Sequence, residues 1–366
     1  MHRGILRATA VCLLLTGLVL PTAAATGETP STPPTPATTP APAPATTPAP
    51  ATTTPSVPTS GSTSQPGPTA AAGYSDLPQS HWAYPMVMTL RGAGVLAFDP
   101  TGRFRPDEPI RRAELFKMVL TARKVDTGAA CRGQFLDVPC WAWYAPQAEM
   151  AYRMAIADLQ GEDKLAPEGQ VTRQELFAVI IRALGRRWEA ANLGWEEINT
   201  RLKPFSDRDQ VAYSAQPAMA LALKSGIMSG YGDGTLRPQR VTTRAEAAAV
   251  ISRILLAAEG LQTATVDGHK IVYKQAIDMT ASEYTTGEPG VGWVTYTGLI
   301  VRMGTVAVDP SVVPLGRLLY VEGYGYAVAA DIGGAIKGNR VDLFTFDYHS
   351  AALLFGMQPR KVYVLP

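Results

Sequence analysis

The hydrophobic and polar positions of this chain follow four different patterns along its length. An apolar run covers residues 8–20, and residues 26–73 then show no apolar periodicity. Residues 74–258 carry apolar runs at helical spacing, separated by turns, and residues 268–366 carry short alternating segments separated by Gly and Pro. These patterns predict a short leader, an unstructured linker, a helical region and a β region, in that order.

The apolar run near the start is typical of a secretory signal. Arg3 and Arg7 precede it, and Ala23-Ala24-Ala25 follows as a small-residue cleavage site, so residues 1–25 are predicted to be removed on export. An uncleaved N-terminal anchor is the alternative, although the run is short for a membrane span. No later stretch reaches the roughly 18 apolar residues of a spanning helix, which predicts a mature protein without an integral membrane segment.

Residues 26–73 are predicted to be a linker. They hold 13 of the 30 prolines, Glu28 as their sole charge, and no aromatic residue, so they cannot bury a core. Such a segment favours extended polyproline II geometry and acts as a semi-stiff tether. With 366 residues the chain is long enough for several domains.

Charge and cysteine content exclude two classes of function. Without Arg3 and Arg7 the chain has 31 basic and 31 acidic residues, a balance that argues against nucleic acid as a partner. The four scattered histidines give no zinc spacing with cysteine, so no metal and no cofactor is predicted. Cys131 and Cys140 lie nine residues apart in an exported chain, where a disulfide and two buried thiols both stay open.

One pattern occurs three times between residues 74 and 258. An Asp is followed six residues later by an aromatic residue, then by a helical apolar run, a turn, and an Arg-x-Glu that opens a second helix. The three sets are Asp76, Trp82 and Arg112; Asp137, Trp143 and Arg173; and Asp207, Tyr213 and Arg244. The arginines are 61 and 71 residues apart, which divides the region into 74–130, 131–200 and 201–258.

This repeat resembles the S-layer homology (SLH) domain, a bacterial surface module often present in three copies. The resemblance implies an all-α pseudo-threefold helical bundle that binds secondary cell-wall polysaccharide, often pyruvylated, or peptidoglycan. It also implies that the nine residues named above lie in or near grooves between repeats, where a guanidinium fits a carboxylate and an aromatic face stacks on a sugar. The alternative is that Asp and Arg cap and pair helix ends while the aromatic side chains fill the core. Since Arg111, Ala155 and Tyr213 depart from the family pattern, not all three grooves need bind.

Three aspartates stand in apolar or glycine-rich frames of the β region: Asp309, Asp331 and Asp342. Because Asp is disfavoured inside strands, the presence of each aspartate in a strand-forming segment needs a structural or functional explanation. Turn formation accounts for Asp309 before Pro310 and for Asp331 before Gly333-Gly334. Asp342 lies between Val341 and Leu343, so strand alternation places its carboxylate opposite those two and on the side of Phe344.

Residues from about 277 to the end resemble the three-aspartate (3D) domain, which is shared with the barrel of membrane-bound lytic transglycosylase A. The opening Met279-Thr280-Ala281-Ser282-Glu283-Tyr284-Thr285 and the aspartate spacings of 22 and 11 carry the resemblance. It implies an all-β six-stranded double-psi β-barrel at 268–366 with a groove for a glycan strand, Asp342 as the catalytic acid, and Asp331 and Asp309 in support. Its candidate substrate-binding residues are Lys337, Gly334, Tyr284 and Thr295.

The chemistry of such a site needs one carboxyl group. That group donates a proton to the glycosidic oxygen and then takes the proton of the muramic acid 6-hydroxyl, which closes a 1,6-anhydro ring without water. Burial beside Phe344 and a neighbouring Asp331 would raise the pKa of Asp342, whereas a close Lys337 would lower it. The sequence thus predicts a secreted, wall-anchored lytic transglycosylase. A muramidase-type hydrolase and a non-catalytic glycan-binding surface protein remain as alternatives.

Overall fold

The computed structural model describes residues 73–96, 101–128, 131–255, 261–286, 288, 291–346 and 354–366, with side chains of 254 and 255 excepted. The predicted signal peptide and linker therefore lie outside the described residues. Within the described ranges no helix is long and apolar enough to cross a membrane.

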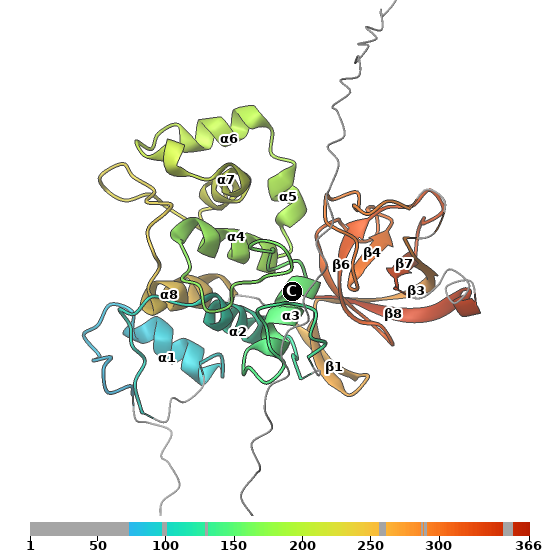
Figure 1. The fold of residues 1–366 in the computed structure, drawn as a ribbon, viewed down its shortest axis with the longest axis horizontal. Coiled ribbons are helices and arrows are strands. Elements are labelled where there is room, and N and C mark those ends of the chain that lie inside the picture. Colours follow the sequence, from blue (N-terminus) through green and yellow to red (C-terminus); the bar gives the residue numbers. More distant parts are fainter. Residues whose placement is uncertain are drawn as a thin grey trace, which may run out of the picture. The chain divides into compact units, whose positions relative to one another are not determined.

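Each of the three repeats forms two helices joined by a turn, as the sequence predicts (Figure 1). The first helices of the repeats are α1 (Tyr84–Gly92), α3 (Ala145–Arg153) and α7 (Gln216–Lys224). The second helices are α2 (Arg112–Ala122), α4 (Arg173–Ala183) and α8 (Arg244–Leu255). Pro85, Pro146 and Pro217 occupy the first turns of α1, α3 and α7, where the missing N–H costs no hydrogen bond.

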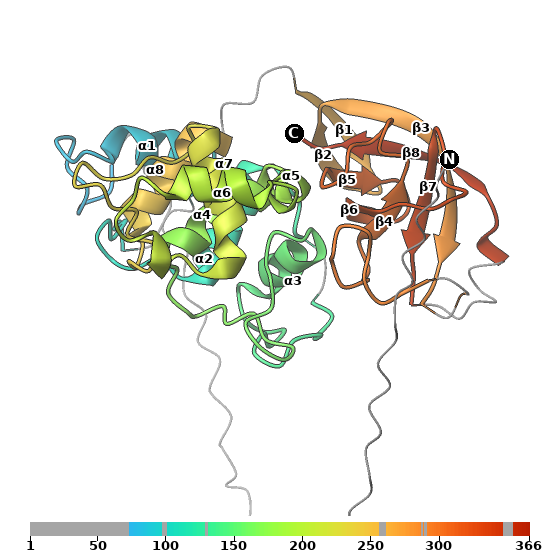
Figure 2. The same cartoon turned by 90° about the horizontal axis from the view of Figure 1, so that it is seen from above.

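The repeats contact one another in cyclic order. Helix α3 packs against α2, α7 packs against α4, and α1 packs against α8, so that the first helix of one repeat lies on the second helix of another (Figure 2). The start of each second helix also donates backbone hydrogen bonds to the turn of the following repeat: Arg112 N–H to Gly169 O, Arg173 N–H to Arg240 O, and Arg244 N–H to Glu108 O.

Two short helices interrupt this pattern and were not predicted. Helices α5 (Arg187–Ala191) and α6 (Trp195–Leu202) lie between α4 and the third repeat, and both pack against α7. The 3-10 turns η1 (Arg208–Gln210) and η2 (Tyr213–Ala215) follow them. This insertion accounts for the longer spacing between the second and third Arg-x-Glu motifs.

Cys131 and Cys140 form a disulfide, which decides between the two alternatives that the sequence left open. The bridge closes the segment that leads into α3. Beside it, the buried Glu149 carboxylate accepts the backbone N–H groups of Arg132 and Gly133.

The β region consists of a hairpin and a closed barrel. Strands β1 (Gln262–Val266) and β2 (His269–Tyr273) pair only with each other, so the connection predicted before residue 268 contains a strand, and the segment 269–273 lies outside the barrel. The barrel strands are β3 (Gln275–Tyr284), β4 (Thr305–Val308), β5 (Leu318–Val321), β6 (Gly325–Asp331), β7 (Arg340–Phe344) and β8 (Gln358–Val364). Their order is β3-β7-β4-β6-β5-β8, which confirms a closed six-stranded barrel.

Alternation along the strands separates the interior of the barrel from its outer surface. The interior holds one apolar cluster that includes Ala281, Val306, Val308, Val341 and Leu343. The residues between them on β3, β4 and β7 therefore face outward. On that outer face Phe344, Tyr284 and Val301 form a separate small cluster.

Candidate functional site

Register across four neighbouring strands brings two of the predicted aspartates to one level on the outer face. Ser282 of β3 is the partner of Asp342 of β7, and Asp342 is the partner of Ala307 of β4. Ala307 is in turn the partner of Asp331 of β6. These four residues form a row, which we call the acid row, in the order Ser282, Asp342, Ala307, Asp331.

A β-bulge completes the acid row. Strands β4 and β6 pair through Val306 and Ala329, and the next pair is Ala307 with Asp331, so that Ala330 is skipped. A bulge of this kind redirects the side chain that follows it. The carboxylate of Asp331 accepts the backbone N–H of Tyr296, which belongs to the loop between β3 and β4.

The two carboxyl groups of the acid row stand on either side of a small residue. Asp342 and Asp331 are two strand spacings apart, so their Cα atoms are separated by roughly 10 Å. Ala307, which lies between the two acids, carries only a methyl group and is 4% exposed.

Asp342 has the properties of a general acid. Its side chain is half-buried, and this burial is the largest cause that raises the pKa of its carboxyl group, with the charges of Glu288 and Asp331 adding to the rise. The Ser282 hydroxyl donates a hydrogen bond of 2.7 Å to Asp342, which together with Arg340 opposes the rise. Since the net shift is upward, the protonated form persists to higher pH than in an ordinary aspartic acid.

Asp309 does not join the acid row by any hydrogen bond among the described residues. Its carboxylate accepts the N–H of Gly338 at 2.7 Å and both the N–H and the hydroxyl of Ser311, so it ties the β4–β5 connection to the β6–β7 loop. The bond from Gly338 and those from Ser311 hold its pKa at about 2, with a contribution from Lys337. Asp309 is therefore a charged structural support rather than an acid.

The four candidate substrate-binding residues occupy two kinds of place. Lys337 and Gly334 are exposed on the loop between β6 and β7. Tyr284 and Thr295 are buried, each about 4% exposed. Tyr284 packs its ring against Phe344, and the Thr295 hydroxyl accepts the N–H of Leu299. In this structure the two buried side chains support the outer face instead of lining it.

The three repeat aspartates are loop supports and not exposed ligands. Each carboxylate accepts the N–H groups of two consecutive residues about 28 positions later, at 2.7–3.0 Å. The second donor in each case has a left-handed backbone: Arg105 (φ 59°), Ala166 (φ 47°) and Arg237 (φ 50°). Asp76, Asp137 and Asp207 thus fix three strained turns, and their contact with a wall polymer stays a prediction.

The three repeat arginines differ in their interaction partners. Arg112 forms an ion pair with Glu175 of the second repeat, and Arg244 forms one with Glu114 of the first. Arg173 pairs with no carboxylate among the described residues. Its guanidinium donates to the Ser229 carbonyl and lies 4.8 Å from the centre of the Tyr231 ring.

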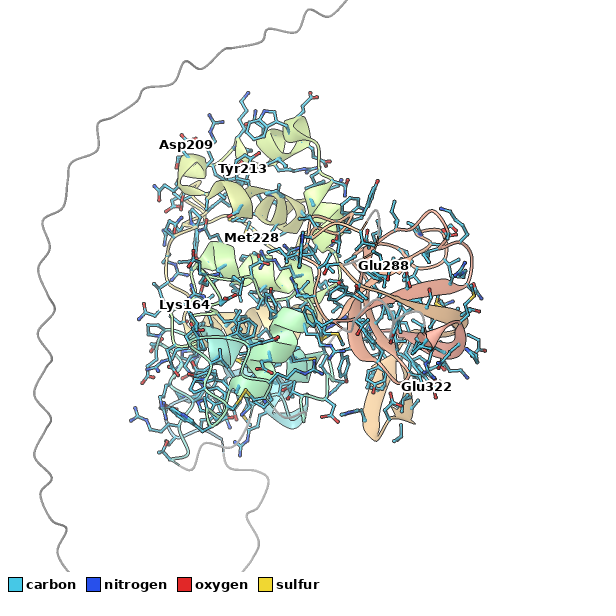
Figure 3. The ribbon with its side chains drawn as sticks, turned by 45° about the vertical axis from the view of Figure 1, so that its right-hand side comes forward. Lys164, Asp209, Tyr213, Met228, Glu288 and Glu322 are labelled. Carbon is cyan, nitrogen blue, oxygen red and sulfur yellow. A yellow bond between two sulfur atoms is a disulfide. The ribbon has the colours of Figure 1, made fainter. Side chains whose placement is uncertain are left out.

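The repeat aromatic residues are exposed, which excludes the alternative that they fill the core. Trp82 is 56% exposed, Trp143 is 54% exposed and Tyr213 is 81% exposed. Figure 3 shows Tyr213 at the surface of the third repeat. Lys117 lies 5.3 Å from the ring centre of Trp143, so this aromatic face sits beside a cation.

Two residues of the site were not recognised from the sequence. Ser282 was read only as part of the opening motif, although alternation along β3 puts it on the outer face with Tyr284. Glu288, labelled in Figure 3, follows β3 in the sequence Thr-Thr-Gly-Glu-Pro-Gly, where no periodicity indicates its neighbours. Its charge nevertheless acts on Asp342.

Comparison with known families identifies both regions of the chain. The S-layer homology domain model matches residues 73–116 and 204–248, and the 3D domain model matches residues 304–366. The chain therefore carries SLH repeats and a 3D domain. All three aspartates of the β region fall inside the 3D match, while residues 131–200 lie outside both SLH matches. The SLH repeats indicate association with the cell surface.

Individual relatives match limited parts of the chain. The cell wall-binding protein YocH of Bacillus subtilis is 50% identical over 72 residues, covering 19% of this chain and 25% of that protein. The exoglucanase XynX of Acetivibrio thermocellus is 28% identical over 177 residues, covering 48% of this chain and 16% of that protein. The chain thus spans a quarter or less of the length of these relatives. Among solved structures, MltA from E. coli is 26% identical, with 21% of this chain and 29% of that chain covered and a TM-score of 0.18.

Proposed function

We propose that this protein is a wall-anchored enzyme that cleaves the glycan strands of peptidoglycan as a lytic transglycosylase. The observation that carries the proposal is Asp342, a half-buried carboxyl group with a raised pKa on the outer face of the barrel. One protonated acid is what this reaction requires. We further infer that the barrel is of the double-psi type, as the 3D domain implies.

The reaction would use Asp342 twice. Its carboxyl group donates a proton to the oxygen that links N-acetylmuramic acid to N-acetylglucosamine, and that bond breaks. The resulting carboxylate then takes the proton of the muramic acid 6-hydroxyl, whose oxygen bonds to the anomeric carbon to give the 1,6-anhydro product. No water is consumed, and Asp342 ends protonated again.

Ser282 and Asp331 would assist this sequence. The Ser282 hydroxyl donates to Asp342 and so fixes the direction of the carboxyl group between the two proton transfers. Asp331 contributes negative charge across Ala307, which favours the positive character that develops at the anomeric carbon. Asp309 would keep the loop that follows Asp331 in place.

The SLH repeats would hold the enzyme on its substrate. We infer a pseudo-threefold bundle from the cyclic packing of the six repeat helices. Exposed aromatic rings next to cations, as at Trp143 and Lys117, suit an acidic wall polysaccharide such as a pyruvylated one. The names of the relatives agree, since YocH is a cell wall-binding protein and XynX is a glycan-degrading enzyme. Anchoring raises the effective concentration of the strands at the barrel.

The experiment is a digestion of purified sacculi with the full mature chain, followed by mass spectrometry of the released fragments. The chain is compared with Asp342→Asn and with Asp278→Asn, a matched control whose carboxylate is exposed on the same barrel. We expect anhydro-ended fragments from the parent and the control, and a loss of 10²–10⁴-fold in Asp342→Asn. Reducing ends that depend on Asp342 would identify a hydrolase instead, and binding without release would identify a non-catalytic surface protein.

A further inference from the structure

A second site lies near the start of β4 and the end of β7, where the barrel contacts the second repeat. A pocket with a cavity volume of about 80 Å³ is lined there by Arg132, Tyr152 and Arg153 from the repeat and by Arg302 and Phe346 from the barrel, among others. Arg153 fixes the contact by donating to the carbonyls of Tyr326 and Tyr324 at 2.8 and 2.7 Å.

The barrel and the second repeat approach each other closely at Gly304. Its backbone has φ 96°, and a Cβ atom added there would lie 2.6 Å from Cγ of Arg153. Only glycine therefore fits between the start of β4 and α3. The pocket is thus built on a packed contact.

Arg302 is the central feature of this pocket. Its side chain is 8% exposed, and its guanidinium lies 4.1 Å from the centre of the Tyr152 ring. The Nε and Nη2 atoms are buried and have no hydrogen-bond partner in the described part of the chain. Leaving buried N–H groups of a charged side chain unpaired is costly, so a ligand in this pocket that drew the guanidinium outward and accepted both groups would remove that cost.

The charges in the lining of the pocket are unbalanced, and the charge of Asp158, which lies outside the lining, also acts on Arg302. Arg132, Arg153 and Arg302 supply three positive charges, whereas Glu149 is the one acid in the lining. Glu149 already accepts the backbone N–H groups of Arg132 and Gly133. Arg153 bonds only to neutral carbonyls in the contacts described above. The pocket therefore favours an anion, and the guanidinium fork favours a carboxylate.

The pocket lies near the acid row. Phe346 lines the pocket and packs its ring 5.0 Å from the ring of Phe344, which follows Asp342 on the same face of β7. Arg302 precedes Ala307 by five residues, and its backbone is held by hydrogen bonds with Thr305. The pocket thus lies at most about 16 Å from the acid row.

We propose that the Arg302 pocket binds a carboxylate of the peptide stem carried by the glycan strand. This inference rests on the proposed function, because it takes the glycan strand to lie across the acid row. A stem of three or four residues extends roughly 10–14 Å from its muramic acid, which is comparable with the upper bound of about 16 Å on the separation of the two sites. The pocket makes the enzyme select strands that still carry their peptides.

The test separates binding from cleavage. The full chain is titrated calorimetrically with a disaccharide tetrapeptide, which has no internal bond between muramic acid and a following sugar to cleave, and with the same compound after amidation of its carboxylates. We expect binding of the first compound to weaken at least tenfold on amidation and at least tenfold in Arg302→Gln. Arg132→Gln, at the exposed rim, should weaken binding by a smaller factor, and the distant Arg208→Gln should leave it unchanged.

The same variants are then given intact strands and strands stripped of peptides by an amidase. Arg302→Gln should lose cleavage on intact strands and equal the parent on stripped ones. If Arg302→Gln does not fold, the decision rests on Arg132→Gln and the amidated compound. Equal binding of the amidated and free compounds would overturn the proposal, as would an equal loss of cleavage on both kinds of strand in folded Arg302→Gln. If the parent bound the free disaccharide tetrapeptide but cleaved neither kind of strand, the proposed reaction would be refuted, while the assignment of the pocket to a stem carboxylate would stand.

Discussion

Removal of the Asp137 carboxylate should destabilise the second repeat rather than merely weaken its binding to the wall. The carboxylate accepts the N–H groups of Leu165 and Ala166 at 3.0 and 2.7 Å, and both bonds are partly buried. Ala166 has a left-handed backbone with φ 47°, so the same bonds also hold a strained turn. The Ala166 carbonyl in turn accepts from Arg112, which links the turn to the first repeat.

The magnitude follows from the two bonds. A hydrogen bond to a charged group contributes about 1.5–3 kcal/mol, and partial exposure favours the lower end, so Asp137→Ala should cost roughly 3 kcal/mol of unfolding free energy. For a region of this size each kcal/mol corresponds to roughly 2–4 °C, which gives a fall in Tm of about 6–12 °C for the repeat transition. Asp137→Asn keeps one acceptor and should lose less.

Thermal unfolding of the full chain followed by circular dichroism measures this effect, with wall binding measured on the same samples below the transition. The matched comparison is Trp143→Ala, because Trp143 belongs to the same repeat and its side chain is largely exposed. If Asp137→Ala changed the unfolding free energy by less than about 0.5 kcal/mol yet abolished wall binding, Asp137 would contact the ligand and the structural role assigned to it would be refuted.

Three further predictions concern other parts of the chain. Replacing Cys131 and Cys140 together by serine should lower stability by roughly 2.5 kcal/mol, because the disulfide closes a loop of about ten residues, and parallel denaturant titrations of parent and variant would reveal it. Asp342→Asn should unfold at a higher temperature than the parent at neutral pH. Because folding raises the pKa of Asp342, ionisation of this carboxyl group destabilises the folded parent as pH rises from 3.8 towards the folded value. The higher Tm of Asp342→Asn should therefore disappear below that pH range. A higher Tm that persists at pH 3 would contradict this reasoning. Trp143→Ala and Tyr213→Ala should leave Tm nearly unchanged but reduce the fraction of protein that sediments with purified walls. If neither variant lost wall binding, these aromatic side chains would not contribute to anchoring.

Strand alternation was sufficient to predict the face of Asp342. Val341 and Leu343 lie in the interior cluster, and Phe344 lies on the outer face, as the sequence indicated. The position of Asp331 was not predictable in the same way, because the bulge that skips Ala330 depends on pairing between β4 and β6. Local sequence carries no signal for such a shift.

The repeat pattern likewise predicted the helices but not the roles of its polar residues. The motif located Asp76 and its counterparts, yet their partners stand about 28 residues later, at a separation that periodicity does not address. The repeat pattern did not predict helices α5 and α6, because they belong to one repeat only. The Arg302 pocket arises from a contact between two regions that a reading of each region alone cannot reveal.

The measurement that most directly tests the central claim is digestion of sacculi by the full chain in water enriched in oxygen-18, with mass spectrometry of the new glycan ends. Because the muramic acid 6-hydroxyl supplies the attacking oxygen, the products should be 1,6-anhydro ends that carry no label, and Asp342→Asn should release none of them. Reducing ends labelled with oxygen-18 would show that water attacks the anomeric carbon, and would contradict the assignment of Asp342 as the single acid and base of a lytic transglycosylase.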